Sequence, residues 1–152
     1  MRKYFGILFI ALAIAGVSCK KDSDNPSGGS GGVFKATIDG QVRSTTNPTF
    51  AVNSGILMIS GAFASGGMMS ITVQNFTAPG TFTIGGGNMH MGTYGPSANT
   101  NDQYSANGIM GSGTITVTSY SASNVKGTFN FTGYNNAQQS KAVTNGEFDI
   151  SK

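Results

Sequence analysis

The feature of this sequence that most constrains its fold is an alternation of apolar and polar residues with a period of two, which recurs through residues 33–152. In Ser112 to Tyr120, for example, Ile115 and Val117 alternate with threonines. Successive side chains of a β-strand point to opposite faces, so this pattern predicts strands with one buried face. No stretch has the spacing of three, four and seven residues that a helix requires. We therefore expect one all-β domain.

Short turn signals divide this domain into about eight to ten strands. Asp39-Gly40, Gly66-Gly67 and Pro79-Gly80 are dipeptides typical of tight turns. Short connections favour antiparallel pairing, and because several runs are short we expect an antiparallel β-sandwich. A closed up-and-down β-barrel is the alternative. The strands are expected at residues 34–38, 49–53, 56–65, 68–76, 81–84, 88–94, 112–120, 124–134 and 147–151.

The first 18 residues have the pattern of an export signal. Arg2 and Lys3 give a positive start, and an apolar run interrupted only by Gly6 extends from Phe5 to Ala15. The run has about 11 residues, whereas a helix that spans the apolar core of a bilayer needs roughly 20. We therefore expect residues 1–18 to be a cleaved signal peptide rather than a permanent membrane span.

Cys19 is the only cysteine of the chain, and it follows the apolar run closely. Gly16-Val17-Ser18-Cys19 resembles the lipobox of bacterial lipoproteins, in which a small residue precedes the cysteine, although Gly16 replaces the usual apolar residue. The resemblance implies that Cys19 carries a diacylglyceryl group, begins the mature chain and anchors it to membrane lipid. An ordinary secretory cleavage after Ala15 is the alternative, and it would release the protein.

Residues 19–32 are interpreted as the lipidated cysteine and a flexible tether. Lys20 to Gly32 has no large apolar residue and is rich in glycine and serine, so it behaves as a coil with an end-to-end distance of roughly 20 Å. Its charged cluster, Lys20 to Asp24, resembles the export tag of surface lipoproteins of the Bacteroidota; a merely solvated spacer is the alternative. The expected location is the outer membrane, on its periplasmic or surface face.

The charge of the mature chain argues against one class of partner. The whole sequence has a net charge of +3, and removal of Arg2 and Lys3 with the signal peptide lowers it to +1. The remaining charges are scattered and form no basic stripe of the kind that neutralises phosphates. We therefore expect no nucleic-acid partner.

Residues suited to catalysis are sparse. His90 is the only histidine, and no local motif pairs it with a serine nucleophile and with Asp39, Asp102 or Asp149. Gly85-Gly86-Gly87 is not followed by the Lys-Ser/Thr and the helix of a phosphate-binding loop, so we interpret it as a turn. We expect no catalytic residue, no cofactor and no enzymatic activity.

Two binding hypotheses accompany this expectation. Met89-His90-Met91 supplies the thioether and imidazole ligands that copper prefers, but in a strand the two methionines point away from His90, and we expect methionines to fill gaps in the core instead. Tyr94 and Tyr104 flank the longest loop, Gly95 to Asp102, where exposed tyrosines would stack on sugar rings. This second hypothesis predicts a concave, tyrosine-lined site for a glycan or another small ligand.

Both ends of the domain resemble a known family. Phe34 to Gly40 (FKATIDG), Val125 to Thr132 (VKGTFNFT) and Thr144 to Ile150 (TNGEFDI) are similar to segments of small uncharacterised Bacteroidota lipoproteins that share a domain of unknown function. The resemblance implies an anchored β-domain and no particular activity. We therefore expect a non-enzymatic binding or structural module of the cell envelope, held by acylated Cys19, with an envelope protein or a glycan as its partner.

Overall fold

A computed structural model describes residues 31–152. The expected signal peptide, Cys19 and all but the last two residues of the expected tether lie outside the described residues. No helix among residues 31–152 is long and apolar enough to cross a membrane. The elements are β1 (Gly32–Ile38), β2 (Gln41–Asn53), β3 (Ile56–Phe63), β4 (Met68–Val73), β5 (Gly80–Ile84), β6 (Met91–Gly95), the 3-10 helix η1 (Thr100–Asp102), β7 (Tyr104–Ala106), β8 (Ser112–Tyr120), β9 (Asn124–Tyr134) and β10 (Ser140–Ser151).

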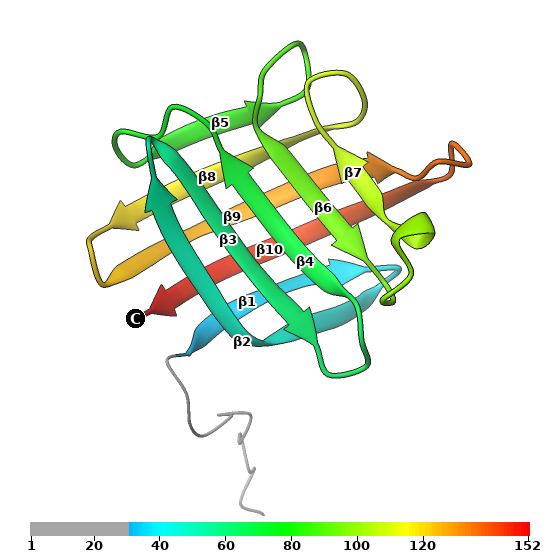
Figure 1. Ribbon diagram of the computed structural model, residues 1–152, viewed down its shortest axis with the longest axis horizontal. Helices are drawn as coiled ribbons and strands as arrows, with labels where there is room; N and C mark the ends of the chain where they lie inside the picture. Colours follow the sequence, from blue (N-terminus) through cyan, green and yellow to red (C-terminus); the bar gives the residue numbers. More distant parts are fainter. Residues whose placement is uncertain (1–30) are drawn as a thin grey trace, which may run out of the picture.

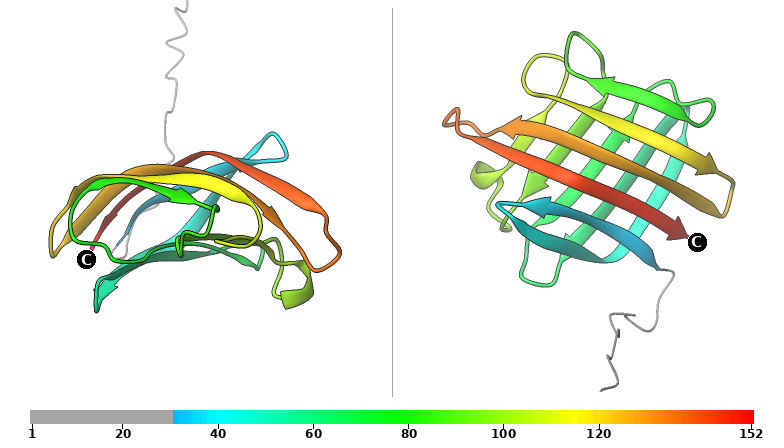
Figure 2. Two further views of the ribbon diagram at one scale, coloured as in Figure 1. Left: turned by 90° about the horizontal axis from the view of Figure 1, so that it is seen from above. Right: turned by 180° about the vertical axis from the view of Figure 1, so that it is seen from behind.

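Eight of these strands close a ring of antiparallel neighbours, in the order β10-β1-β2-β3-β4-β6-β7-β9 with β9 pairing back to β10. β8 pairs with the same edge of β9 as the short β7 does, and β5 pairs with β8. The all-β prediction is confirmed, and the architecture is the closed barrel that was the alternative. The barrel is flattened, with β2, β3, β4 and β6 in front of β5, β8, β9 and β10 (Figures 1 and 2), so the sandwich fits only in part.

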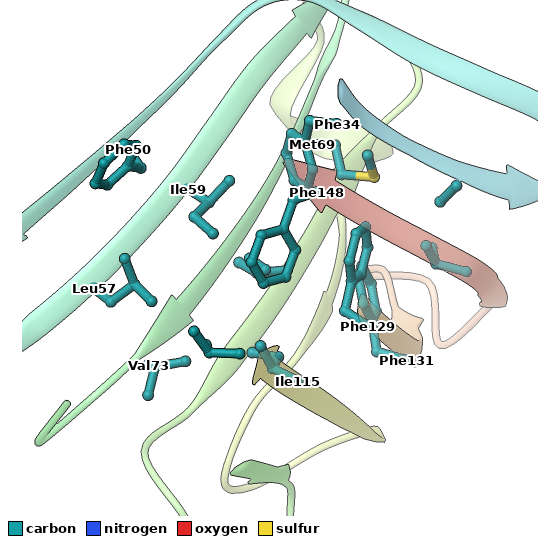
Figure 3. Close-up of a cluster of buried hydrophobic side chains, with 14 of the residues drawn as sticks. Phe34, Phe50, Leu57, Ile59, Met69, Val73, Ile115, Phe129, Phe131 and Phe148 are labelled. Atoms are coloured by element: carbon teal, nitrogen blue, oxygen red, sulfur yellow. The ribbon is translucent and has the colours of Figure 1, made fainter. Parts of the chain in front are cut away.

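The alternation along each strand places one row of side chains in the core. On β9, Val125, Phe129 and Phe131 are buried, and Lys126, Thr128 and Asn130 face outward. The ring centroid of Phe129 lies 5.4 Å from that of Phe34 on β1 and 6.4 Å from that of Phe148 on β10. Figure 3 shows these aromatic side chains within the buried cluster. Burial of apolar area, the main stabilising contribution to folding, is therefore concentrated between the two layers.

The structure contains strand segments that the alternation did not predict. β2 begins at Gln41, β10 begins at Ser140, and β7 was not expected. The pairing of β2 with β3 shifts register around Asn47, where φ is 46°, and the pairing of β10 with β9 shifts around Asn145, where φ is 48°. Such bulges interrupt the alternation while the strand continues, so sequence that resembles a turn remains part of the barrel.

Candidate functional site

A pocket of about 410 Å³ lies between two loops, residues 85–90 before β6 and residues 107–111 before β8. Both loops lie at the upper end of the barrel in Figure 1, whereas β1 begins at the lower end. Ligand sites typically have volumes of roughly 300–1,000 Å³. We call this feature the two-loop pocket. Its lining consists of Thr72, Gln74, Gly87, Asn88, Met89, Met91, Asn107, Gly108 and Ile109.

Part of the lining of the pocket is the outer face of the barrel around Thr72 on β4. Thr72 alternates with the buried Ile71 and Val73 and so faces outward, yet only 6 % of it is exposed. Its cross-strand partners are Met58 on β3 and Met91 on β6. Side chains directly opposite on neighbouring strands are within contact distance, so the two thioether chains cover Thr72 from both sides. This part of the barrel surface is therefore apolar.

The methionines lie mostly outside the core, which corrects the expectation that they fill gaps in it. Among residues 31–152, Met69 alone of the methionines is buried in the core. Met89 is 73 % exposed, and Met58, Met68 and Met110 are exposed as well. Methionine is flexible and polarisable, and it occurs often on adaptable binding surfaces. The exposed positions of these methionines therefore favour contact with a ligand over a role in packing.

The two loops are joined to each other by their backbones. The N–H of Gly87 donates to the carbonyl of Gly108 over 3.0 Å. Within the first loop, both the backbone N–H and the Nδ2 of Asn88 donate to the carbonyl of Gly85, at 3.1 and 2.9 Å. Gly85, Gly86 and Gly87 all have positive φ, which glycine adopts at little cost. The prediction of a glycine turn is confirmed, and the turn forms one wall of the pocket.

The second loop holds an apolar side chain out in solvent. The Oδ1 of Asn107 accepts hydrogen bonds from the backbone N–H of Ile109 at 2.9 Å and of Met110 at 3.1 Å, and the N–H of Asn107 donates to the Met110 carbonyl. The turn presents Ile109 with 97 % of its surface exposed. Burying such a side chain contributes about 1.5–3 kcal/mol. Ile109 is therefore a group that gains stabilisation when something covers it.

His90 belongs to the first loop but does not line the two-loop pocket. Its Nδ1 accepts a hydrogen bond from the backbone N–H of Gln74 at 3.2 Å. Its ring packs edge-on against the ring of Phe82, with 5.3 Å between the ring centroids. Met89 and Met91, in contrast, both line the pocket. The three residues therefore do not converge on one copper site. The strand expected at residues 88–94 begins only at Met91, so the separation comes from the loop that holds Met89 and His90 and not from alternation along a strand.

The environment of His90 leads to a prediction about pH. Burial disfavours the charged ring and lowers the pKa of His90, and Nδ1 must be unprotonated to accept from Gln74. An NMR titration is expected to place the midpoint below the ordinary value of about 6.5. Because the unfolded chain then binds more protons, the free energy of unfolding should fall as pH drops through about 6.5, and His90→Gln should remove this slope. A midpoint above 6.5 would contradict the assignment.

A smaller pocket of about 210 Å³ lies at the loop where a tyrosine-lined site was predicted. Met68, Ser97 and Gln103 are among its lining residues, but no tyrosine is. Tyr94 is buried because its position on β6 faces the core, and Tyr104 stacks on it with ring centroids 6.3 Å apart. The prediction of a tyrosine-lined site is therefore wrong, because both tyrosine rings contribute to packing.

The acidic residues are engaged in contacts away from His90. Asp39 forms an ion pair with Lys141, and Asp102 accepts a hydrogen bond from the Oγ of Ser97. Hydrogen bonds from Asn124 and Lys126 lower the pKa of Asp149. Within residues 31–152, no three His, Cys, Asp or Glu side chains are grouped to hold a metal ion. The arrangement of these side chains therefore brings no carboxylate to the imidazole.

Comparison with protein families places this barrel in a group. The model of the family described as a domain of unknown function, DUF6252, matches residues 30–149. The chain belongs to this family. Comparisons with curated proteins and with solved structures found no match. The DUF6252 domain covers the two-loop pocket and almost all of the barrel. Membership in a family of unknown function was predicted and is confirmed; the link to Bacteroidota lipoproteins stays a prediction.

The contact between the two loops of the DUF6252 domain is expected to depend on Gly108. A Cβ atom at this position would lie 2.6 Å from the carbonyl oxygen of Asn88, so Gly108→Ala must displace the Gly87–Asn88 backbone. We expect a loss of about 1–3 kcal/mol in unfolding free energy and faster amide exchange at Gly87. Gly80→Ala is the matched control, since the nearest atom there is on Phe82 at 3.8 Å. Unchanged protection of Gly87 in Gly108→Ala would contradict the contact.

Proposed function

We propose that this protein is a lipid-anchored, non-enzymatic binding module of the cell envelope, and that the two-loop pocket is its binding site. The observation that carries the binding role is the exposure of Ile109 at the rim of a pocket whose two loops are joined by the Gly87–Gly108 hydrogen bond and are each held by hydrogen bonds of their own. Ile109 and Met89 are both exposed and line the same pocket, and such a grouping of exposed apolar side chains is typical of an interaction site.

The anchor is proposed from the first 32 residues of the sequence. The positive start, the short apolar run and the position of Cys19 support export and acylation, with membrane lipid as the first partner. The mature chain enters the barrel at Gly32, where β1 begins. The two loops lie at the other end of the barrel (Figures 1 and 2). A tether that enters at Gly32 therefore suits a domain that presents its pocket away from the membrane.

The absence of enzymatic activity is proposed from the contacts of the reactive side chains. His90 contacts a backbone N–H and an aromatic ring, and Asp39, Asp102 and Asp149 each have other partners. General acid–base catalysis requires such groups within hydrogen-bond reach of one another and of a substrate. Their separation supports a binding function rather than a catalytic one.

Photocrosslinking in living cells tests the binding site. We would replace Ile109 by p-benzoylphenylalanine, irradiate the cells and measure the intact mass of the protein from the membrane fraction. The matched control carries the same group in place of Val42, a 68 % exposed residue of β2 outside the pocket. We expect an adduct at position 109 and none at position 42. No adduct at position 109, or equal adducts at both, would show that the pocket is not the binding site.

A further inference from the structure

We infer that the ligand of the two-loop pocket is a neutral small molecule with an apolar body and one group that both donates and accepts a hydrogen bond, as a carboxamide does. The inference rests on the proposed function, because it assigns a ligand class to the same pocket. Three features of the lining carry it: the absence of charge, the orientation of two asparagine amides, and the apolar side chains beside them.

The lining of the pocket contains no Asp, Glu, Lys, Arg or His. A charged ligand that enters such a site loses hydration without gaining an opposite charge, which is costly. The nearest titratable side chain in sequence, His90, is engaged by Gln74 and Phe82 and is not part of the lining. The pocket therefore offers an opposite charge to neither an anion nor a cation.

Two asparagine amides supply one acceptor and one donor. The Nδ2 of Asn88 donates to the carbonyl of Gly85, which fixes the orientation of that amide and leaves its Oδ1 as an acceptor. The Oδ1 of Asn107 accepts from two backbone N–H groups, which fixes the second amide and leaves its Nδ2 as a donor. Among residues 31–152, neither remaining atom has a protein partner. Because both asparagines line the pocket, a ligand that pairs with both amides must itself donate and accept.

The apolar side chains of the lining are Met89, Met91 and Ile109. Thioether chains adapt to different shapes; Met91 lies directly across from Thr72, and Met89 lines the same pocket. The pocket volume of about 410 Å³ is sufficient for a ligand with two fused rings. The ligand body that fits this wall is therefore aromatic or branched rather than sugar-like.

Three naphthalene compounds that differ only in their polar group test the inference. They are 2-naphthamide, which is neutral and donates and accepts; 2-naphthoate, which is an anion; and naphthalene, which has no polar group. The protein is residues 19–152 with Cys19→Ser, which contains the complete ring of strands and its core. Binding is followed by NMR of ¹³C-labelled methionine methyl groups. We expect shifts at Met89 and Met91 but not at Met69, and about ten-fold tighter binding of the amide than of either analogue.

Asn107→Asp provides the matched variant. The carboxylate still accepts from the backbone N–H groups of Ile109 and Met110, so the turn is kept, but the Nδ2 donor is lost. We expect about five- to ten-fold weaker binding of 2-naphthamide with an unchanged Met69 signal. If 2-naphthoate bound as tightly as 2-naphthamide, the inference that the ligand is neutral would be wrong. If naphthalene bound as tightly, the inference that the ligand pairs with the two asparagine amides would be wrong. No shift with any compound would overturn the ligand class, whereas crosslinking at Ile109 tests the proposed function separately.

Discussion

Cys19→Ala is expected to abolish acylation and to leave residues 1–18 on the chain. Cleavage of a lipoprotein signal follows transfer of lipid to the cysteine thiol, so removal of the thiol blocks both steps. Each buried CH₂ of an acyl chain contributes about 0.8 kcal/mol to membrane binding, which makes two or three chains a stable anchor. Intact mass measurement of the protein from its native membrane fraction checks this. The wild type should begin at Cys19 and carry the mass of the acyl groups.

The control for this experiment is Ser18→Ala, which keeps a small residue before the cysteine. This variant should be processed and acylated like the wild type. An unacylated wild type that begins near Gly16 would show that the chain is secreted freely. In that case Cys19 is a free thiol, and partners should be sought in solution rather than at a membrane.

Phe148→Ala is expected to cost about 3–5 kcal/mol of unfolding free energy. Phe148 is 0 % exposed, and its ring lies between the layers of the barrel beside Phe129. It also stands on β10, opposite Phe34 of β1 and Gly127 of β9, where the ring of strands closes. Small domains are stable by only about 5–15 kcal/mol, so this one cavity removes a large share. Urea denaturation followed by circular dichroism measures the loss.

Ile109→Ala is the control for the core substitution, because it also truncates a large apolar side chain. Its exposure predicts a change within about 0.5 kcal/mol. If Ile109→Ala were as destabilising as Phe148→Ala, Ile109 would be packed against the protein and not be available to a ligand. A loss below about 1 kcal/mol for Phe148→Ala would contradict the position of the core.

Much of the fold was predictable because the alternation is local information. It indicated the buried rows of β3, β4, β8 and β9 directly. The closure of the ring was not predictable, since it depends on the pairing of β10 with both β1 and β9. The first half of β2 was missed because none of residues 41–47 is buried, so no apolar row marks it. The first half of β10 was missed because the bulge at Asn145 interrupts the alternation while the pairing continues.

The candidate site was predictable only in its parts. The glycine run at 85–87 was recognised as a turn. His90 is separated from Met89 and Met91 as predicted, but by the conformation of a loop, since β6 begins only at Met91. The pocket itself depends on the hydrogen bond between Gly87 and Gly108, which joins loops that no sequence pattern relates. The exposure of the methionines was missed because methionine is usually a core residue. Tyr94 was misplaced because its face is set by the pairing of β6 with β4.

Oxidation of the methionines by hydrogen peroxide tests the central claim, that the two-loop pocket is occupied in the envelope. A thioether is oxidised to its sulfoxide only where peroxide reaches it, and mass spectrometry of peptides gives the rate at each site. Met68 is exposed outside the two-loop pocket and serves as the internal control. We expect Met89 to oxidise more slowly in native envelopes than in the purified protein, with Met68 equal in both. Equal rates for Met89 in the two preparations would contradict a binding role for this pocket.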